Sequence, residues 1–264
     1  MNTELFADLA SRSQAGDREA MEQLLLMAHT PVSYQCRKIL QNDRAAETLT
    51  KEILALIHTQ LDSLSDPNDF EKWMCRVTAA RCMKTLNRLR RDNSDETPVP
   101  PENIQIPRQT LDEVQTAQVI QQIADHLPEE TRLCLLLYCC GGLEFGGIAR
   151  LTGFTEASVV EHLNRAQGII NNHLRKYHKM GIRFARIRSL PELLCTAMYH
   201  SGDPGAAAVL VDDLLGKKAP ASAVPRRRRN SATRRLIAAA MAAAILLLIL
   251  LAAIAFLELN RMAG

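Results

Sequence analysis

Aromatic residues are scarce in this sequence, at 4%, with a single tryptophan. Leucine and alanine dominate the apolar residues, and this mixture favours helices over sheets, in which β-branched and aromatic residues are enriched. The chain has 264 residues, which is enough for one or two domains with cores of their own. We therefore expect an all-α protein.

The sequence also lacks the usual signatures of metal sites and catalysis. Its seven cysteines form no Cys-x-x-Cys pair, and no group of cysteine and histidine has zinc-binding spacing. Cys36, Cys75, Cys82 and Cys134 lie within apolar helical patterns, which indicates buried, reduced thiols. HExxH, GxSxG and P-loop patterns are absent. We expect no enzyme, no cofactor and no metal.

A long apolar run near the end of the chain predicts a membrane span. Leu236–Leu257 reads LIAAAMAAAILLLILLAAIAFL, 22 residues without a charge. As a helix this run would cross a hydrocarbon core of about 30 Å, the alternative being a buried core helix. Arginines crowd the residues before it, whereas only Glu258 and Arg261 follow, so the body would be cytoplasmic and residues 258–264 external. A single-pass cell-membrane protein is the expectation, with the arginine run also able to contact lipid headgroups.

Periodic apolar residues in the first block, residues 1–91, predict four helices. A short helix precedes Gly16, and Asp17 is a suitable N-cap for a second helix that runs to about Leu40. Two more helices are expected over about 44–64 and 70–91. Residues 92–110 hold four prolines in a polar, aperiodic stretch, so we expect a flexible linker there.

The second block, residues 111–179, has the pattern of a helix-turn-helix domain. A helix ends near Leu127, another begins at Pro128, and a short helix over 144–151 is stopped by Gly153. Thr155 then caps a helix over 156–179. Residues 180–235 form a juxtamembrane region, in which 190–198 and 206–215 are suited to short helices.

A basic stripe and the helix-turn-helix are the candidate binding features. Arg81, Lys84, Arg88 and Arg91 recur every three or four residues, so they share one helix face that suits a phosphate backbone, or simply solvent. In the last helix of the second block, Ser158, His162 and Arg165 are expected to face a DNA groove, unless the unit is a plain helical hairpin. The residues expected to pack inward are Val159, Leu163 and Ala166.

Together, the two blocks resemble the two domains of extracytoplasmic-function sigma factors, the small promoter-recognition subunits of bacterial RNA polymerase. The resemblance covers about Leu5–Arg91 and Val114–Tyr177. It is carried by AGDREAMEQLL (15–25), DRAAETLTKEIL (43–54), DFEKWMCRVTAARCMKTLNRLRR (69–91) and LPEETRLCLLLYCCGGLEFGGIARLTGFTEASVVEHLNRAQ (127–167), in this order and with a proline-rich linker between the blocks.

The resemblance implies a sigma factor that directs core RNA polymerase to promoter DNA, with an anti-sigma protein or a protease as a further partner. It implies three sets of contact residues in this chain. The polymerase-binding set is Asp43, Glu47, Leu49 and Glu52. The set for −10 DNA is Trp73, Arg76, Arg81, Lys84 and Arg88. The set for −35 DNA is Thr155, Ser158, His162 and Arg165.

Departures from the family pattern keep two other hypotheses open. Thr48-Leu49-Thr50-Lys51 replaces the usual Asp-Leu-x-Gln, Gly146 and Gly147 replace helix formers, and Val160, Glu161 and His162 replace Lys, Ser and Arg. These changes favour a sigma-like regulator that binds DNA or protein without recruiting polymerase. The low net charge of +3 favours a membrane-anchored helical adaptor with no nucleic-acid role.

Overall fold

The computed structural model describes residues 3–92, 110–184 and 189–216 of the chain. Within these ranges the protein is helical, with an isolated parallel bridge between Thr110 and Arg183. The expected all-α fold is therefore confirmed. The chain divides into two compact units, Met1–Lys218 and Ala219–Gly264, and all of the described residues belong to the first.

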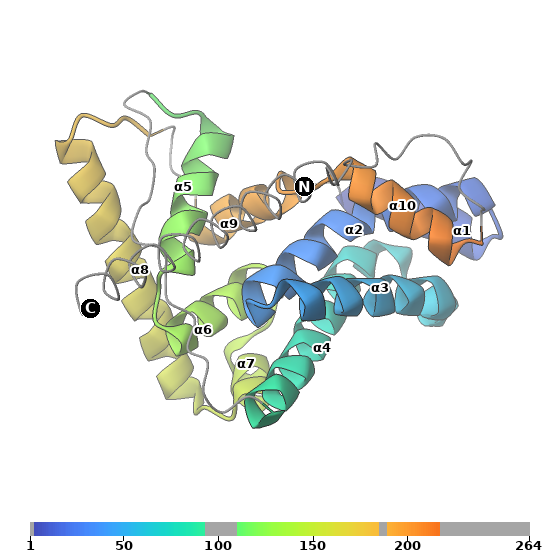
Figure 1. The fold of residues 1–264 in the computed structure, drawn as a ribbon, viewed down its shortest axis with the longest axis horizontal. Coiled ribbons are helices and arrows are strands. Elements are labelled where there is room, and N and C mark those ends of the chain that lie inside the picture. Colours follow the sequence, from blue (N-terminus) through green and yellow to red (C-terminus); the bar gives the residue numbers. More distant parts are fainter. Residues whose placement is uncertain (1–2, 93–109, 185–188, 217–264) are drawn as a thin grey trace, which may run out of the picture. The chain divides into compact units, whose positions relative to one another are not determined.

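Ten α-helices follow one another in the described residues (Figure 1). Those before residue 93 are α1 (Thr3–Gln14), α2 (Arg18–Leu40), α3 (Asp43–Gln60) and α4 (Phe70–Asp92), with short 3₁₀ turns at Leu61–Ser63 and Pro67–Asp69 between the last two. Those after residue 109 are α5 (Glu113–Asp125), α6 (Glu129–Cys139), α7 (Phe145–Thr152), α8 (Glu156–Lys179), α9 (Leu190–Tyr199) and α10 (Pro204–Leu214).

Capping side chains fix several of these boundaries. The Asp17 carboxylate accepts hydrogen bonds from the backbone N–H groups of Glu19 and Ala20, and the Thr155 hydroxyl accepts one from Ser158. Each cap satisfies a donor that the first helical turn leaves without a partner. The helix expected over 44–64 instead ends at Gln60, because the chain tightens into a 3₁₀ turn at Leu61. Pro128 lies at the N-cap rather than at the first helical position.

The helix α2 is the centre of the N-terminal helices, since it packs against α1, α3 and α4. Leu24, Leu25 and Val32 on α2 are fully buried. Phe6 of α1 and Phe70 of α4 meet with ring centroids 5.6 Å apart. Burial of these apolar side chains is the main stabilising contribution to such a cluster.

The helices on both sides of the expected linker pack against each other. The helix α2 contacts α6, and α9 contacts α2, α5 and α6, while α10 lies on α2 (Figure 1). Residues 190–214, for which the sequence indicated two short helices and no role, thus join the two blocks. The expected linker itself falls largely on 93–109, outside the described residues.

A polar network with a buried centre lies where α2 meets α5 and α6. The Tyr34 hydroxyl donates to Gln121 Oε1, and Gln121 Nε2 donates to Asp125 Oδ1 at 2.7 Å. Lys38 Nζ lies 2.5 Å from Asp125 Oδ2, and the Arg132 guanidinium donates to the Lys38 carbonyl. Tyr34, Gln121 and Arg132 are each at most 5% exposed. Burial therefore raises the pKa of Tyr34 and keeps its hydroxyl protonated as a donor.

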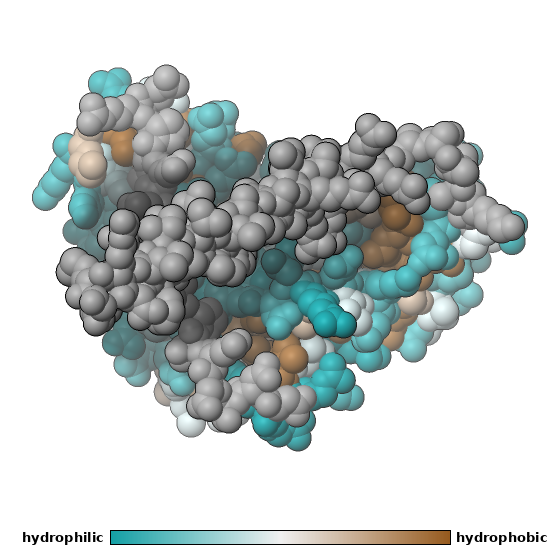
Figure 2. All heavy atoms as spheres, viewed as in Figure 1, coloured by the Kyte–Doolittle hydropathy of each residue, from teal (hydrophilic) through white to brown (hydrophobic). Residues whose placement is uncertain are grey.

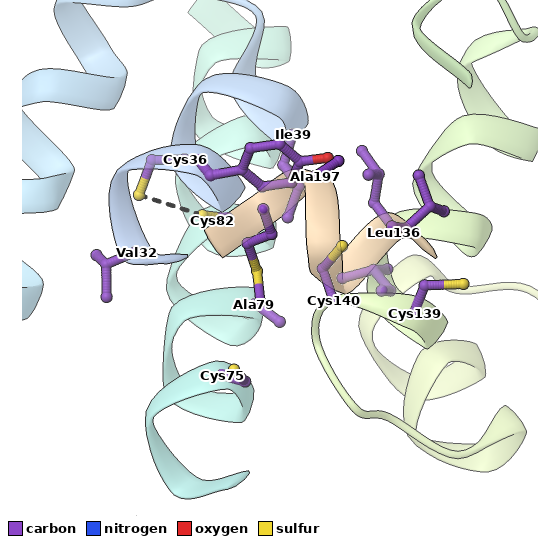
Figure 3. Packing of buried hydrophobic residues seen from close by; sticks show 14 of the residues in the cluster. Val32, Cys36, Ile39, Cys75, Ala79, Cys82, Leu136, Cys139, Cys140 and Ala197 are labelled. Carbon is purple, nitrogen blue, oxygen red and sulfur yellow. Dashed lines mark hydrogen bonds between the residues drawn. The ribbon is translucent and has the colours of Figure 1, made fainter. Parts of the chain in front are cut away.

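Most of the cysteines gather at the same junction. Figure 3 shows Cys36 on α2, Cys75 and Cys82 on α4, and Cys139 and Cys140 at the end of α6, among apolar side chains. All seven cysteines are free, and the Cys82 thiol lies 3.6 Å from the Cys36 sulfur. The expectation of buried, reduced thiols for Cys36, Cys75, Cys82 and Cys134 is confirmed.

The prediction of a single-pass membrane protein is corrected. No helix in residues 3–92, 110–184 and 189–216 is long and apolar enough to cross a bilayer. The long helices α2, α4 and α8 interleave charged and apolar side chains, and Figure 2 shows hydrophilic residues over much of the coloured surface. The predicted span, with its ends at Leu236 and Leu257, lies outside the described residues.

Two glycines in and beside α8 are expected to respond oppositely to replacement by alanine. Gly168 lies in α8 with no atom near an added Cβ, so Gly168→Ala should raise the free energy of unfolding by about 0.5–1 kcal/mol. Gly153 has a φ of 81°, so Gly153→Ala should lower it by about 1–2 kcal/mol. Urea unfolding followed by circular dichroism checks both, and equal effects would contradict the αL assignment.

The buried thiols predict a loss of stability at alkaline pH. Burial raises the pKa of Cys75 and Cys139 to about 12, and that of Cys134 and Cys195 to about 11, from an ordinary value of 9.0. The unfolded chain therefore loses thiol protons that the folded protein keeps, so the free energy of unfolding should fall as pH rises above about 9. Urea unfolding at a series of pH values measures this, and Cys75→Ala should flatten the decline. If the free energy of unfolding already falls below about pH 8, ionisation of the thiols is not the cause.

Candidate nucleic-acid interface

A groove between α3 and α4 gathers the basic stripe. It has a volume of about 200 Å³, and the residues that line it are hereafter called the basic groove: Leu49, Glu52, Arg81, Lys84, Thr85, Arg88 and Arg91. The four cations come from α4, where spacing by three and four residues stacks them on one face. The predicted same-face arrangement of these four residues is confirmed.

The cations of the basic groove are available to a ligand. Arg81, Lys84, Arg88 and Arg91 are exposed, and in the described part of the chain none of them forms an ion pair. Arg90, one residue away, instead pairs with Glu129 at 2.7 Å. Among the lining residues Glu52 is the one carboxylate, so positive charge exceeds negative charge four to one. Such a groove attracts a polyanion.

A second hollow of about 280 Å³ continues the groove toward the start of α3. Arg44 and Asn42 line it together with Arg88 and Leu49, which both grooves share. Arg44 was not among the residues chosen from the sequence. Its only sequence signal was its position in the first turn of α3, and this gives no indication that it faces α4.

Three of the four residues expected to bind polymerase are exposed, and the fourth is buried. Asp43, Glu47 and Glu52 are exposed on α3. Leu49 is 4% exposed and lies with Ala46 and Ile53 on the side of α3 that packs into the core. Its edge forms part of the groove floor, so Leu49 shapes the groove more than it offers a contact surface.

The residues expected to bind −10 DNA do not form one cluster. Arg81, Lys84 and Arg88 lie together in the basic groove. Arg76 lies at a different hollow, of about 670 Å³, with side chains of α7 and the start of α8. Trp73 is half-buried beside Phe70, with ring centroids 6.0 Å apart. The five-residue step from Arg76 to Arg81 turns the two side chains to different sides of α4.

The helices α7 and α8 have the local geometry of a helix-turn-helix. Gly153 has a left-handed φ of 81°, and its N–H donates to the Ala149 carbonyl at 2.9 Å, which ends α7. The Thr155 hydroxyl then caps α8. Val159 and Ala166 are buried and Leu163 packs against the core, as the sequence indicated.

The side chains expected to read −35 DNA are only partly on the outer face of α8. Thr155 and Arg165 are exposed, and Ser158 is half-buried. His162 turns inward: its Nδ1 lies 3.2 Å from Thr131 Oγ1, and its ring lies 5.3 Å from that of Phe154. Its side chain is 14% exposed, with Glu130 Oε2 at 3.7 Å from Nε2.

The outer face of the first turns of α8 is acidic rather than basic. Glu156, Val160 and Glu161 are exposed there, and Arg165 is the nearest cation on that face. Like charge repels phosphate, so this face suits a polyanion less well than the basic groove does. No cluster of three or more metal-ligating side chains occurs in the described residues.

Searches of protein-family models and of curated proteins find no match to this chain.

The inward position of His162 predicts a structural role for it. His162→Ala removes the partner of the buried Thr131 hydroxyl and the contact with Phe154, so the free energy of unfolding should fall by about 1–3 kcal/mol. Arg165→Ala, on the exposed face of the same helix, should change it by less than about 0.5 kcal/mol. Chemical denaturation of both variants measures the contrast. Comparable losses would show that both side chains are structural.

Proposed function

We propose that this chain is a sigma-factor-like protein of transcription initiation, which contacts DNA through the basic groove and binds core RNA polymerase through α3. The observation that carries the proposal is the set of four unpaired cations on one face of α4. Regularly spaced cations can follow a phosphate backbone, and their binding releases counterions.

Promoter DNA with an unpaired segment is the form that this surface suits best. The four cations of the basic groove follow one another at steps of three and four residues along one face of α4, an arrangement suited to the phosphates of one strand. A single strand can lay its phosphates along Arg81, Lys84 and Arg88, as single-strand-binding proteins do in cationic grooves. This matches the role of the −10 helix in the family that the chain resembles.

Core RNA polymerase is the proposed protein partner. The exposed acids Asp43, Glu47 and Glu52 lie on α3, the helix that resembles the polymerase-binding helix of sigma factors. An acidic helix face attracts a basic partner surface and raises the rate of encounter. Glu52 borders both the proposed polymerase surface and the basic groove, so the two surfaces are contiguous.

One feature of α8 favours a second candidate, a sigma-like regulator that binds DNA without recruiting polymerase. His162 is packed inward and Glu156 and Glu161 are exposed, so the helix-turn-helix is poorly suited to a second DNA contact. Run-off transcription with purified core polymerase separates the candidates. Promoter-dependent transcripts support the sigma factor, and DNA binding without transcripts supports the regulator.

The basic groove predicts a salt dependence of DNA binding that one triple variant should reduce. In Arg81→Ala/Lys84→Ala/Arg88→Ala, up to three phosphate contacts are lost, so the slope of log affinity against log salt should shrink by about 2 to 3. Fluorescence anisotropy with a mixed-sequence DNA that contains an unpaired segment measures the slope.

Lys72→Ala is the matched control for this prediction. Lys72 also lies on α4 and is exposed, but it is placed near Asp69, at 3.9 Å, and not in the groove. We expect the Lys72→Ala slope to equal that of the unmodified chain. If the triple variant and the control give the same slope, the basic groove is not the DNA contact.

A further inference from the structure

Two helices at the end of the described structure hold the two blocks together. We call Leu190–Leu214, with α9, α10 and the turn between them, the clasp. The helix α9 packs against α5 and α6 of the second block and against α2 of the first (Figure 1). Its Cys195 thiol lies 3.3 Å from the Cys139 carbonyl of α6, and its Tyr199 hydroxyl donates to Glu71 of α4.

The turn of the clasp lies directly on α2. A Cβ added to Gly202 would lie 2.4 Å from the Thr30 hydroxyl oxygen and 3.2 Å from the Thr30 Cβ. This position therefore has room for glycine alone while the turn is seated. The turn between α9 and α10 is therefore closely packed against Thr30 of α2.

The clasp also reaches the proposed polymerase surface. Lys51 of α3 forms an ion pair with Asp213 of α10. Glu47 lies one turn before Lys51 on α3, in the order that favours an intrahelical ion pair, yet Lys51 pairs with the clasp. Lys51 stands where the sigma-factor pattern has glutamine, and this lysine is the ion-pair partner of Asp213.

The helix α2 carries two buried polar side chains on the part of its length that the clasp contacts. His29 Nδ1 and Gln35 Oε1, both on α2, are buried and make no hydrogen bond in the described structure. Gln35 Nε2 lies 3.9 Å from the Met198 sulfur of α9, and the Gln35 side chain also interacts with Cys75 of α4. Burial lowers the pKa of His29, and Arg37 lowers it further. Asp203, at the N-cap of α10, acts in the opposite direction and raises it. These atoms regain water when the clasp leaves, which lowers the cost of opening.

We propose that the clasp is an autoinhibitory element: seated on α2, it holds the two blocks closed and places α10 beside Lys51, next to the exposed acids of the polymerase-binding surface of α3. Core RNA polymerase binds the open form. The apparent affinity of the chain for polymerase therefore falls as the population of the closed form rises. The basic groove lies between α3 and α4, and no residue of the clasp lines it, so it is open while the clasp is seated. This inference rests on the proposed function.

The test uses the full chain and two independent ways of opening the clasp. Gly202→Ala forces the turn away from Thr30, and Thr30→Ala in the same chain removes the atoms at 2.4 and 3.0 Å and restores the seat. Asp213→Lys places a like charge opposite Lys51. Asp212→Lys is its matched control, because it makes the same charge change on α10 at a residue without an ion pair in the described structure.

Two readouts are measured on each variant. Hydrogen–deuterium exchange of residues 190–214 reports opening, and retention of purified core RNA polymerase reports access to α3. Gly202→Ala and Asp213→Lys should raise exchange in the clasp and bind polymerase about two- to fivefold more tightly. Asp212→Lys and Gly202→Ala/Thr30→Ala should resemble the unmodified chain in both readouts.

Three results overturn the proposal. If exchange rises without tighter polymerase binding, the clasp does not obstruct the binding of polymerase. If neither opening variant raises exchange, these contacts do not hold the clasp. If the open forms bind no polymerase at all, the proposed function fails as well. Salt-dependent DNA binding by the basic groove, which is independent of the clasp, then shows whether the DNA-binding part of that function remains.

Discussion

The buried polar network between α2 and α5–α6 is the constraint on which the rest of the structure depends. Tyr34, Gln121, Asp125 and Lys38 satisfy one another across the junction, and Arg132 secures the end of α2 through the Lys38 carbonyl. Apolar side chains fit many partners, but hydrogen-bonded groups fit few orientations once they are buried. The network therefore sets the register at which the second block meets the first, and the surrounding thiols and leucines fill the space that it defines.

The placement of the second block against the first decides which charged side chains form ion pairs and which do not. Arg90 pairs with Glu129 of the second block, and Lys51 pairs with Asp213 of α10. For Arg81, Lys84 and Arg88, Glu52 is the one carboxylate among the described residues that line the basic groove. Within the second block, the packing of α8 on α6 turns His162 toward Thr131, which removes it from the outer face of α8. A sequence with a net charge of only +3 thus presents a localised cationic groove.

Local signals account for the parts of this structure that the sequence predicts well. Asp17, Thr155 and Gly153 mark helix ends because a capping side chain or a left-handed backbone acts within a few residues. The stripe on α4 follows from helical spacing alone, and so does the burial of Val159 and Ala166. The buried side of Leu49 also follows from its helical spacing with Ala46 and Ile53, whereas the family resemblance implied a polymerase contact for it.

By itself the sequence determined the helices, their caps and the faces on which charged and apolar side chains lie, because these depend on interactions within one or two turns. The tertiary structure alone decided that Arg44 joins the basic groove, that Arg76 leaves it, that His162 points inward and that residues 190–214 fasten the two blocks. Each of these depends on which distant helix lies opposite, and such long-range pairings leave no periodic trace in the chain.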